Sequence, residues 1–473
     1  MKNKPTQIIF IAVCFIICII PFACMSFART DSTTENKRLK ELPELYNDGI
    51  NFNYFKDLGA YFEDHFAFRN VMVNADSCIQ GDVFNVSNMD TVVKGDNGWL
   101  YYSDTLNDFL MKSKMSERGI YNIANNIDIT QSYVEGKGAD FIFTIAPNKN
   151  SLYGDNMPYY YSKKAGKKKN IDSLLPILKR SKIKYTDLFS LFKGQREVLY
   201  LKRDSHWNNK GAALAYNEIM NSLNRSHNDY ITVMAKRTKT EYGDLNKMLY
   251  PLSAQPEWNS YYQYDYGYKY VTETESVEDP WIETESKKGN GKLLMFRDSF
   301  GNTLLPFFAE EFKKAYFSKE TPYPIDEYIN AYAPDCVVVE KVERNIDELA
   351  SRPPVLTGIN IELKGKAKSE KTRTTLNAAS AESNTMYYEF SGIVDEKYIE
   401  TYTDIYVALT VNGKRTSYKA FSISDKNGDN GFLLYVPKKH IKTDGKIAVD
   451  IITDSSGILT NVKSESYDLN KIK

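Results

Sequence analysis

Apolar residues along the first three quarters of the chain alternate between short unbroken runs and longer segments with helical spacing. The short runs are typical of buried strands and lie at 141–146, 198–201, 292–296 and 336–339. The segments with helical spacing lie between them, at 116–137, 171–181, 209–223 and 301–312. Strands that alternate with helices in this way predict an α/β fold with a doubly wound, mostly parallel sheet.

Two parts of the chain break this alternation. Residues 251–290 are rich in Tyr, Glu and Ser and show little periodicity, which predicts a long excursion over the surface. After Arg352 the apolar runs become short and alternating, with turn signals such as Asn412-Gly413 between them. Short strands with regular turn signals predict a C-terminal β-sandwich domain at 355–473. Its tyrosines would suit a carbohydrate-binding surface, although they suit an ordinary core better.

The amino end has the pattern of an export segment. Lys2 and Lys4 precede an almost unbroken apolar run from Ile8 to Cys24, which is at the short limit for crossing a bilayer. Ser26-Phe27-Ala28 offers a cleavage site, so residues 1–28 are expected to be a signal peptide or an N-terminal membrane anchor. In either case the rest of the chain is extracytoplasmic, secreted or held at the outer face of the membrane.

Length and composition narrow the classes of function. The 473 residues exceed one ordinary core, and we divide them into a tether at 29–49, an α/β domain at 50–352 and the sandwich. Lysine plus arginine equals aspartate plus glutamate, at 61 each, so no overall field would recruit nucleic acid. Outside the apolar segment only Cys78 and Cys336 remain, and we expect free thiols. No Cys/His spacing resembles a zinc site, so neither a metal nor another cofactor is implied.

The candidate chemistry lies in two short segments, 203–207 (Arg-Asp-Ser-His-Trp) and 297–301 (Arg-Asp-Ser-Phe-Gly). Ser299 follows a predicted strand and precedes a predicted helix, where its hydroxyl can stand beside unpaired helix N–H groups. Asp204 and His206 are two residues apart, and on an extended segment their side chains point the same way. Together the three residues would supply the nucleophile, the base and the base-orienting carboxylate of serine acyl chemistry.

Position in the fold strengthens this interpretation. Lys149, His206 and Ser299 all follow directly after predicted strands, and ligands of doubly wound sheets bind at the carboxyl ends of strands. The alternatives are a buried, hydrogen-bonded His206 beside Trp207, a Ser299 that serves as a helix N-cap, and a solvated loop lysine at 149. We favour catalysis for His206 and Ser299 because the two segments occur together.

At these residues the chain resembles the DHHW group of SGNH-hydrolase-like proteins and is similar to the alginate O-acetyltransferases of the AlgX/AlgJ type. Ordinary SGNH hydrolases place the Asp-x-His piece after the serine, whereas here it precedes the serine, as in this group. The resemblance implies an SGNH-hydrolase-like doubly wound domain and does not cover residues 355–473. The matching pieces lie in one order within about 50–350, at 66–69, 98–101, 146–149, 152–153, 204–207, 243–245 and 297–300.

The resemblance implies a Ser299–His206–Asp204 triad that moves an O-acyl group, usually acetyl, onto hydroxyls of an extracellular or cell-wall polysaccharide. The expected partners are the polysaccharide acceptor and a membrane-bound O-acyltransferase that supplies the acetyl donor. The same triad would serve an extracellular carbohydrate acetylesterase, and a third alternative is a non-catalytic glycan-binding wall protein.

The resemblance also implies further site residues. An oxyanion hole is expected from the Ser299 N–H together with Asn148 or Lys149. Arg297 stands where ordinary SGNH enzymes have glycine, so it would pair with Asp298 or line and narrow the acyl pocket. The full set of oxyanion and substrate-binding candidates is Asn148, Lys149, Arg297, Trp207 and Asp244.

Overall fold

A seven-stranded sheet lies at the centre of the computed structural model, which describes residues 4–25, 39–46, 49–262, 265–441 and 445–472. The strand order is β4-β3-β11-β9-β10-β8-β7. Neighbours from β4 to β10 are parallel, while β8 and β7 are antiparallel. The mostly parallel α/β sheet predicted from the sequence is therefore confirmed. The strands are β3 (Asp140–Ala146), β4 (Tyr185–Thr186), β7 (Tyr268–Tyr270), β8 (Trp281–Ser286), β9 (Lys292–Phe296), β10 (Lys314–Ser318) and β11 (Cys336–Val342).

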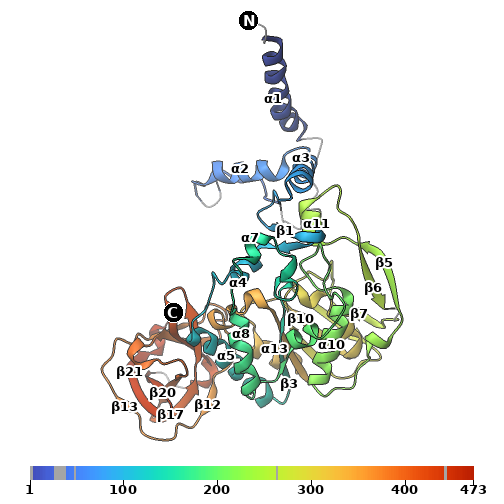
Figure 1. Ribbon diagram of the computed structural model, residues 1–473. Coiled ribbons are helices and arrows are strands. Elements are labelled where there is room, and N and C mark those ends of the chain that lie inside the picture. The colour runs from blue at the N-terminus through green and yellow to red at the C-terminus, as the bar shows by residue number, and fades with distance from the viewer. Residues whose placement is uncertain (1–3, 26–38, 47–48, 263–264, 442–444, 473) are drawn as a thin grey trace.

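Helices pack on both faces of this sheet (Figure 1). In β3, Phe141, Phe143 and Ile145 point into one core, and Ile142 and Ala146 point into the other. Because both faces are buried, the strand reads as an unbroken apolar run rather than an alternating one. The first core contains α5 (Glu117–Gly136), α8 (Asn170–Arg180) and α13 (Ile325–Tyr332), and the second contains α9 (Leu188–Lys193), α10 (Asn209–Ser222) and α12 (Leu305–Glu311).

The carboxyl ends of β3, β11 and β9 lie side by side, since the three strands are adjacent and parallel. Polar residues lie within two positions of each end: Asn148 after β3, Glu343 after β11 and Asp298 after β9. A parallel sheet therefore brings three segments that are distant in sequence to one edge, where ligands of such sheets bind.

Three local expectations at this edge were wrong. The apolar run at 198–201 forms no strand, and its only pairing is an isolated bridge between Tyr200 and Trp207. Leu199, Tyr200 and Leu201 are buried in a connection outside the sheet, so His206 does not follow a strand. Lys149, which the sequence analysis considered as a loop lysine, begins helix α6 (Lys149–Leu152). The expected helix at 301–312 is divided into a 3₁₀ turn (Phe300–Asn302) and α12.

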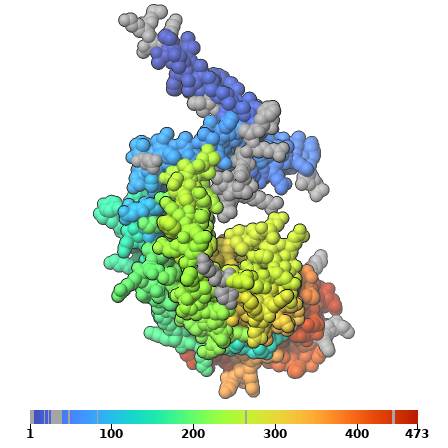
Figure 2. Space-filling view, turned by 90° about the vertical axis from the view of Figure 1, so that its right-hand side faces the viewer, coloured from blue at the N-terminus to red at the C-terminus, as the bar shows by residue number. Residues whose placement is uncertain are grey.

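Residues 251–290 contain more structure than their weak periodicity predicted. Part of the segment pairs in a separate antiparallel sheet of β5 (Ala235–Glu241) and β6 (Glu257–Tyr262), with helix α11 (Asp244–Leu249) between these strands. The rest supplies β7 and β8 to the central sheet. The side chains of β5 are exposed or half-exposed along its whole length. The sequence therefore shows no apolar alternation that would predict this strand. Figure 2 shows this yellow-green part of the chain on the surface of the molecule.

The C-terminal part forms two antiparallel-rich sheets, with strand orders β12-β17-β16-β20-β21-β13 and β14-β15-β19-β18. They enclose a core of their own, so the predicted sandwich architecture is confirmed. That the part folds as a separate domain stays a prediction. The strands are β12 (Ile359–Ile361), β13 (Lys368–Ser369), β14 (Asn377–Ser380), β15 (Tyr387–Ile393), β16 (Asp404–Val411), β17 (Lys414–Lys419), β18 (Phe421–Asp425), β19 (Gly428–Pro437), β20 (Lys446–Ser455) and β21 (Ile458–Asp468).

The amino end carries helix α1 (Lys4–Cys24), which projects from one end of the molecule (Figure 1). Helices α2 (Tyr54–His65) and α3 (Arg69–Cys78) and the β1–β2 hairpin (Val92–Lys94, Leu100–Tyr102) lie between it and the α/β sheet. Within the described ranges, no helix combines the length and apolar character required to cross a bilayer. The predicted cleavage site at 26–28 and most of the tether fall outside those ranges.

The two cysteines outside the apolar segment are free thiols, as expected. Cys336 is buried at the start of β11, and burial raises the pKa of its thiol to about 12. Cys78 is partly buried at the end of α3. Neither thiol lies in the two segments that carry the candidate chemistry.

Candidate active site

Ser299 lies in the turn that leaves the carboxyl end of β9. Its hydroxyl is not used as a helix cap, because the Oδ1 of Asp298 accepts the Phe300 N–H at 2.9 Å instead. The Ser299 Oγ lies 2.9 Å from the Nε2 of His206. The N-cap alternative therefore belongs to Asp298, and Ser299 keeps its hydroxyl available for another partner.

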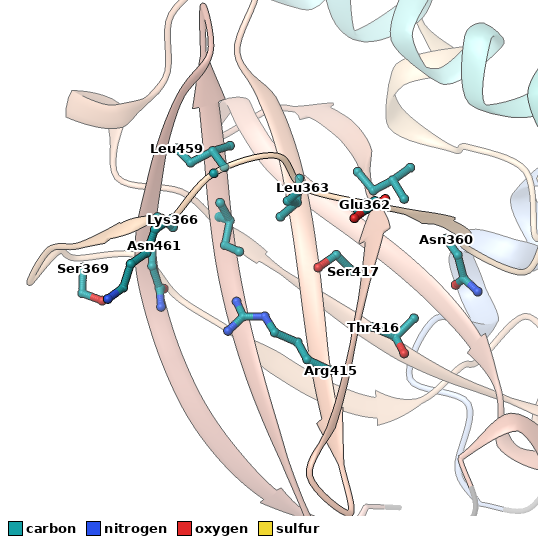
Figure 3. Close-up of a pocket in the computed structure, with 14 residues that line it drawn as sticks. Asn360, Glu362, Leu363, Lys366, Ser369, Arg415, Thr416, Ser417, Leu459 and Asn461 are labelled. Atoms are coloured by element: carbon teal, nitrogen blue, oxygen red, sulfur yellow. The ribbon is translucent and has the colours of Figure 1, made fainter.

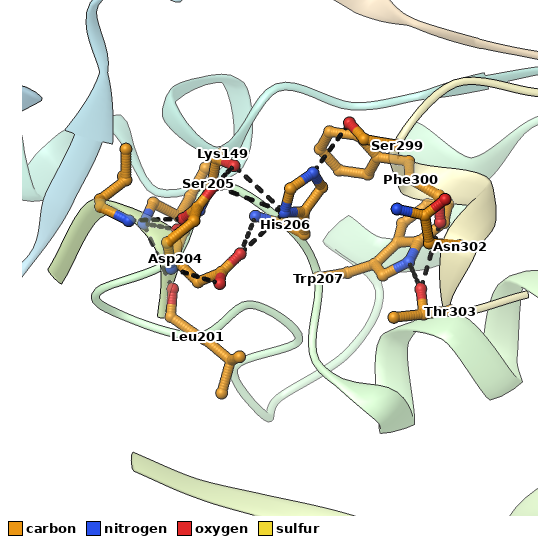
Figure 4. A network of polar contacts seen from close by, with 12 residues as sticks. Lys149, Leu201, Asp204, Ser205, His206, Trp207, Ser299, Phe300, Asn302 and Thr303 are labelled. Atoms are coloured by element: carbon orange, nitrogen blue, oxygen red, sulfur yellow. Dashed lines mark hydrogen bonds and ion pairs between the residues drawn. The ribbon is translucent and has the colours of Figure 1, made fainter. Parts of the chain in front are cut away.

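Asp204 and His206 meet as the sequence predicted, through a different local geometry. The His206 Nδ1 lies 2.8 Å from the Asp204 Oδ1, which also accepts the His206 backbone N–H at 2.8 Å. A carboxylate that bonds the N–H two residues later closes an Asx turn, not an extended segment. If Nδ1 carries the proton for Asp204, Nε2 is left to accept from Ser299. Figure 4 shows the three side chains in a row.

Asp244 lies behind this row and holds the 204–206 loop. Its Oδ1 accepts the Ser205 N–H at 2.8 Å, and its Oδ2 accepts the Ser205 hydroxyl. In return, the Asp244 N–H donates to the Asp204 Oδ2 at 2.9 Å. The sequence placed Asp244 among substrate-binding candidates, whereas these contacts make it a support for Asp204. The gap from Asp244 Oδ2 to His206 Nδ1 is 3.7 Å.

The side chains in this row shift one another's pKa values. Burial opposes a charge on His206, but the hydrogen bond to Asp204, followed by the charges of Asp204 and Asp244, raises the pKa of the imidazole. Burial likewise opposes ionisation of Asp204, yet its bonds to His206 and to two backbone N–H groups lower the pKa of the carboxyl. Burial and the nearby charge of Asp204 raise the pKa of Asp244. The row therefore favours a negative Asp204 beside an imidazole that readily accepts a proton.

Lys149 points away from the expected oxyanion position. Its ammonium is buried and donates to the carbonyls of Leu201 at 3.2 Å, Lys202 at 3.0 Å and Asp204. Burial lowers the pKa of this amine to about 8. Lys149 is therefore neither a solvated loop lysine nor an oxyanion donor: it fixes the backbone that carries Asp204.

Asn148 is fully buried at the carboxyl end of β3, and its N–H donates to the Glu343 Oε2 at 2.7 Å. This backbone N–H is therefore engaged by Glu343, and the oxyanion role expected of Asn148 stays a prediction. Glu343 lies with Asp108 in a buried carboxyl cluster, where burial raises the pKa of Glu343 to about 7.

Arg297 and Trp207 pack into the protein rather than line a pocket. Arg297 is 3% exposed, and its guanidinium donates to Asn302 and to the carbonyls of Val277 at 3.0 Å and Asp279 at 3.3 Å. It ties the 277–279 segment to the nucleophile turn and does not narrow an acyl pocket. Trp207 is 1% exposed, and its Nε1 donates to the Thr303 Oγ1 at 2.5 Å.

Arg344 is a charged neighbour of His206 that the sequence analysis missed. Its guanidinium lies 5.8 Å from the ring centre of Phe300 and 5.4 Å from that of Tyr102, and its charge lowers the pKa of His206. Phe300 in turn packs against His206, with ring centres 4.9 Å apart. Arg344 is the second residue after β11, so a search of the residues that follow 336–342 would have found it.

Two further features bear on ligand binding. Asp204, His206 and Asp244 offer ligand atoms within 4.8 Å of one another, a spacing that a metal ion can use, but in this structure the same atoms bond within the row. A hollow of about 760 Å³ lies on the C-terminal sheets, lined by residues of β12, β17 and β21 that include Arg415 and Asn461 (Figure 3). Its lining contains no aromatic side chain, and carbohydrate binding there stays a prediction.

Among solved structures, Bacillus cereus PatB1 is similar at 18% identity and a TM-score of 0.44, covering 54% of this chain and 96% of its own. A DHHW family protein from Eubacterium siraeum has 17% identity and a TM-score of 0.40, covering 54% and 91%. Pseudomonas aeruginosa AlgX has 13% identity and a TM-score of 0.32, covering 72% and 85%. No curated protein matches the chain.

Residues 92–286 match the family model described as the SGNH hydrolase-like domain of the acetyltransferase AlgX. The matched segment contains Asp204 and His206 and ends before Ser299. The match agrees with the resemblance found in the motifs, which extended to the serine. Over residues 92–286 the chain is therefore similar to the SGNH hydrolase-like domain of the acetyltransferase AlgX.

Proposed function

We propose that this protein is an extracytoplasmic serine O-acetyltransferase that acetylates hydroxyls of a polysaccharide, with Ser299, His206 and Asp204 as its catalytic triad. The observation that carries the proposal is the unbroken contact row, with 2.9 Å from Ser299 Oγ to His206 Nε2 and 2.8 Å from His206 Nδ1 to Asp204 Oδ1. The family supports acetyl transfer as the reaction class.

In the first half-reaction the Ser299 oxygen attacks the acetyl carbonyl while His206 Nε2 takes the hydroxyl proton. Asp204 holds the tautomer that leaves Nε2 free and stabilises the imidazolium. The tetrahedral intermediate then expels the donor's alkoxide, which receives the proton from His206. The product of this step is an acetyl ester on Ser299.

In the second half-reaction His206 removes a proton from a sugar hydroxyl, and the sugar oxygen attacks the Ser299 ester. Collapse of the intermediate returns the proton to Ser299 and releases the acetylated sugar. Because the Phe300 N–H donates to Asp298, the Ser299 N–H is the backbone donor that we assign to the oxyanion. Arg344 adds a positive charge on this side of His206.

Three expectations from the sequence belong to the same proposal. A membrane-bound O-acyltransferase would present the acetyl donor, the amino-terminal segment would direct export or hold the protein at the membrane, and the polysaccharide would be the acceptor. Each rests on the resemblance and on the apolar run from Ile8 to Cys24.

The test is incubation of the purified protein with an activated acetyl ester, with and without an oligosaccharide. We expect acetylated oligosaccharide, detected by mass spectrometry, and its loss in Ser299→Ala by several orders of magnitude. Transfer that survives in Ser299→Ala would contradict the assignment. Acetate release that is the same with and without sugar would instead favour the esterase alternative.

A further inference from the structure

The turn that carries Ser299 is bonded to β11 through one acidic residue. The Asp298 N–H donates to the Glu340 Oε2 at 3.1 Å, and the Asp298 Oδ2 accepts the Val342 N–H at 2.6 Å. The Asp298 Oδ1 accepts the Phe300 N–H at 2.9 Å. The conformation of the nucleophile turn therefore depends on what Asp298 and Glu340 do together.

Glu340 is fully buried beneath this turn. A Cβ atom at Gly301 would lie 3.2 Å from the Glu340 Oε2, so the turn packs directly onto the carboxyl group. The Glu340 Oε1 is also buried and accepts no hydrogen bond from the described donors. The hydrogen bond between Glu340 and the nucleophile turn is therefore the one with Asp298.

The Glu340 and Asp298 side chains are within hydrogen-bond reach of each other, and a bond between two carboxyl groups requires that one of them keeps a proton. The Asp298 carboxyl group already accepts two backbone N–H groups, from Phe300 and Val342. Glu340 accepts one N–H and is the more deeply buried group, so the proton belongs on Glu340. A neutral carboxylic acid can donate to the Asp298 carboxylate while it accepts the Asp298 N–H.

The charges around Glu340 do not replace this proton. Burial, followed by the charge of Asp298, raises the pKa of Glu340 well above its usual range, and the charge of Lys341 opposes them only in part. Lys341 is committed to Glu348, and Arg297 to Asn302 and two carbonyls. The other titratable groups that face Glu340 are the phenols of Tyr200 and Tyr323.

We propose that Glu340 is a positioning residue for Ser299: its protonated carboxyl group donates to Asp298 and holds the nucleophile turn in register with His206. The proposal rests on the proposed function only in its kinetic part. It predicts that glutamine, which has an amide donor and a carbonyl acceptor of the same shape, replaces Glu340, whereas an apolar residue does not.

The protonation is tested with the full-length protein by the thermal midpoints of wild type and Glu340→Gln from pH 5 to pH 8. In the unfolded chain Glu340 ionises near its ordinary pKa of 4.5, while the folded protein keeps the proton. Folding then binds a proton, so the wild type loses stability as pH rises and Glu340→Gln does not. The midpoint of Glu340→Gln relative to wild type should therefore rise steadily with pH. A difference that stays constant across this range would overturn the proposal.

The positioning role is tested by the rate at which a fluorophosphonate labels Ser299. Glu340→Gln should label within about threefold of wild type, and Glu340→Leu at least about thirtyfold more slowly at saturating probe. Glu310→Gln, which removes a buried carboxylate on α12 away from the turn, should label like wild type. If Glu340→Leu does not fold, Glu340→Met takes its place, because its unbranched chain fills the same space.

The outcomes are separable. Equal labelling of wild type and the apolar variant would refute the positioning role, and so would a glutamine variant as slow as the apolar one. A wild type that is not labelled at Ser299 would refute the proposed function instead, while the thermal midpoints would still report whether Glu340 is protonated.

Discussion

At the scale of single residues, the protonation of His206 is set by opposing neighbours. Asp204 and Asp244 raise the pKa of the imidazole, and Arg344 lowers it. The base must be neutral to accept the Ser299 proton, so acylation falls as pH falls through this pKa. We predict that Arg344→Met shifts the pH below which fluorophosphonate labelling of Ser299 slows, and that it shifts this pH upward by about 0.5–1 unit. Arg344→Lys keeps the charge and should leave this pH unchanged. A shift to lower pH in Arg344→Met would contradict the account.

The sequence could identify these residues but not all of their roles. The pairing of Asp204 with His206 follows from their spacing, although an Asx turn produces it rather than an extended segment. Arg297 and Trp207 looked like pocket residues because sequence carries no sign of the direction in which a side chain points. Both are buried by segments distant in sequence.

At the scale of elements, the short helix α6 secures the loop that carries Asp204. The Lys149 ammonium joins this helix to three carbonyls of residues 201–204. Lys149→Met would leave those carbonyls unpaired, which should lower the free energy of unfolding by about 3 kcal/mol and slow the labelling of Ser299. Urea unfolding measures the first effect. Lys202→Met, an exposed change in the same loop, is the control, and equal stability of the two variants would refute this role.

The predictability of each element followed its burial. Strand β3, buried on both faces, was predicted to within one residue as 141–146, because its apolar run has no other explanation. The hairpin of β5 and β6 was missed, because β5 buries no side chain and gives no periodic signal. The run at 198–201 misled for the opposite reason: it is apolar, and Leu199 and Tyr200 are buried, but it lies outside the sheet. The hydrophobic pattern indicates which residues are buried. It does not indicate which strands pair with one another.

At the scale of the whole molecule, the C-terminal sheets are bound to the α/β domain through helix α5. Arg118 is 8% exposed and donates to the carbonyls of Thr403 at 2.6 Å and Thr401 at 3.2 Å. The first core of the α/β sheet also includes Phe421 and Tyr435 of the C-terminal sheets. No sequence pattern indicates this interface, because its polar contacts join residues almost 300 positions apart.

We predict that Arg118→Met lowers the free energy of unfolding by about 3 kcal/mol, since it strips buried carbonyls of their donor. Arg180→Met removes an exposed arginine at the end of α8 and should change stability by less than about 0.5 kcal/mol. Urea unfolding of both variants measures the difference. Two variants of equal stability would show that the interface does not depend on Arg118.

The most direct test of the central claim is peptide mapping by mass spectrometry after reaction with a fluorophosphonate. The account predicts that the wild-type protein carries the label on Ser299, and that His206→Ala and Asp204→Asn label far more slowly although they remain folded. A label on another residue, or a Ser299 that reacts equally fast without the His206 imidazole, would contradict it.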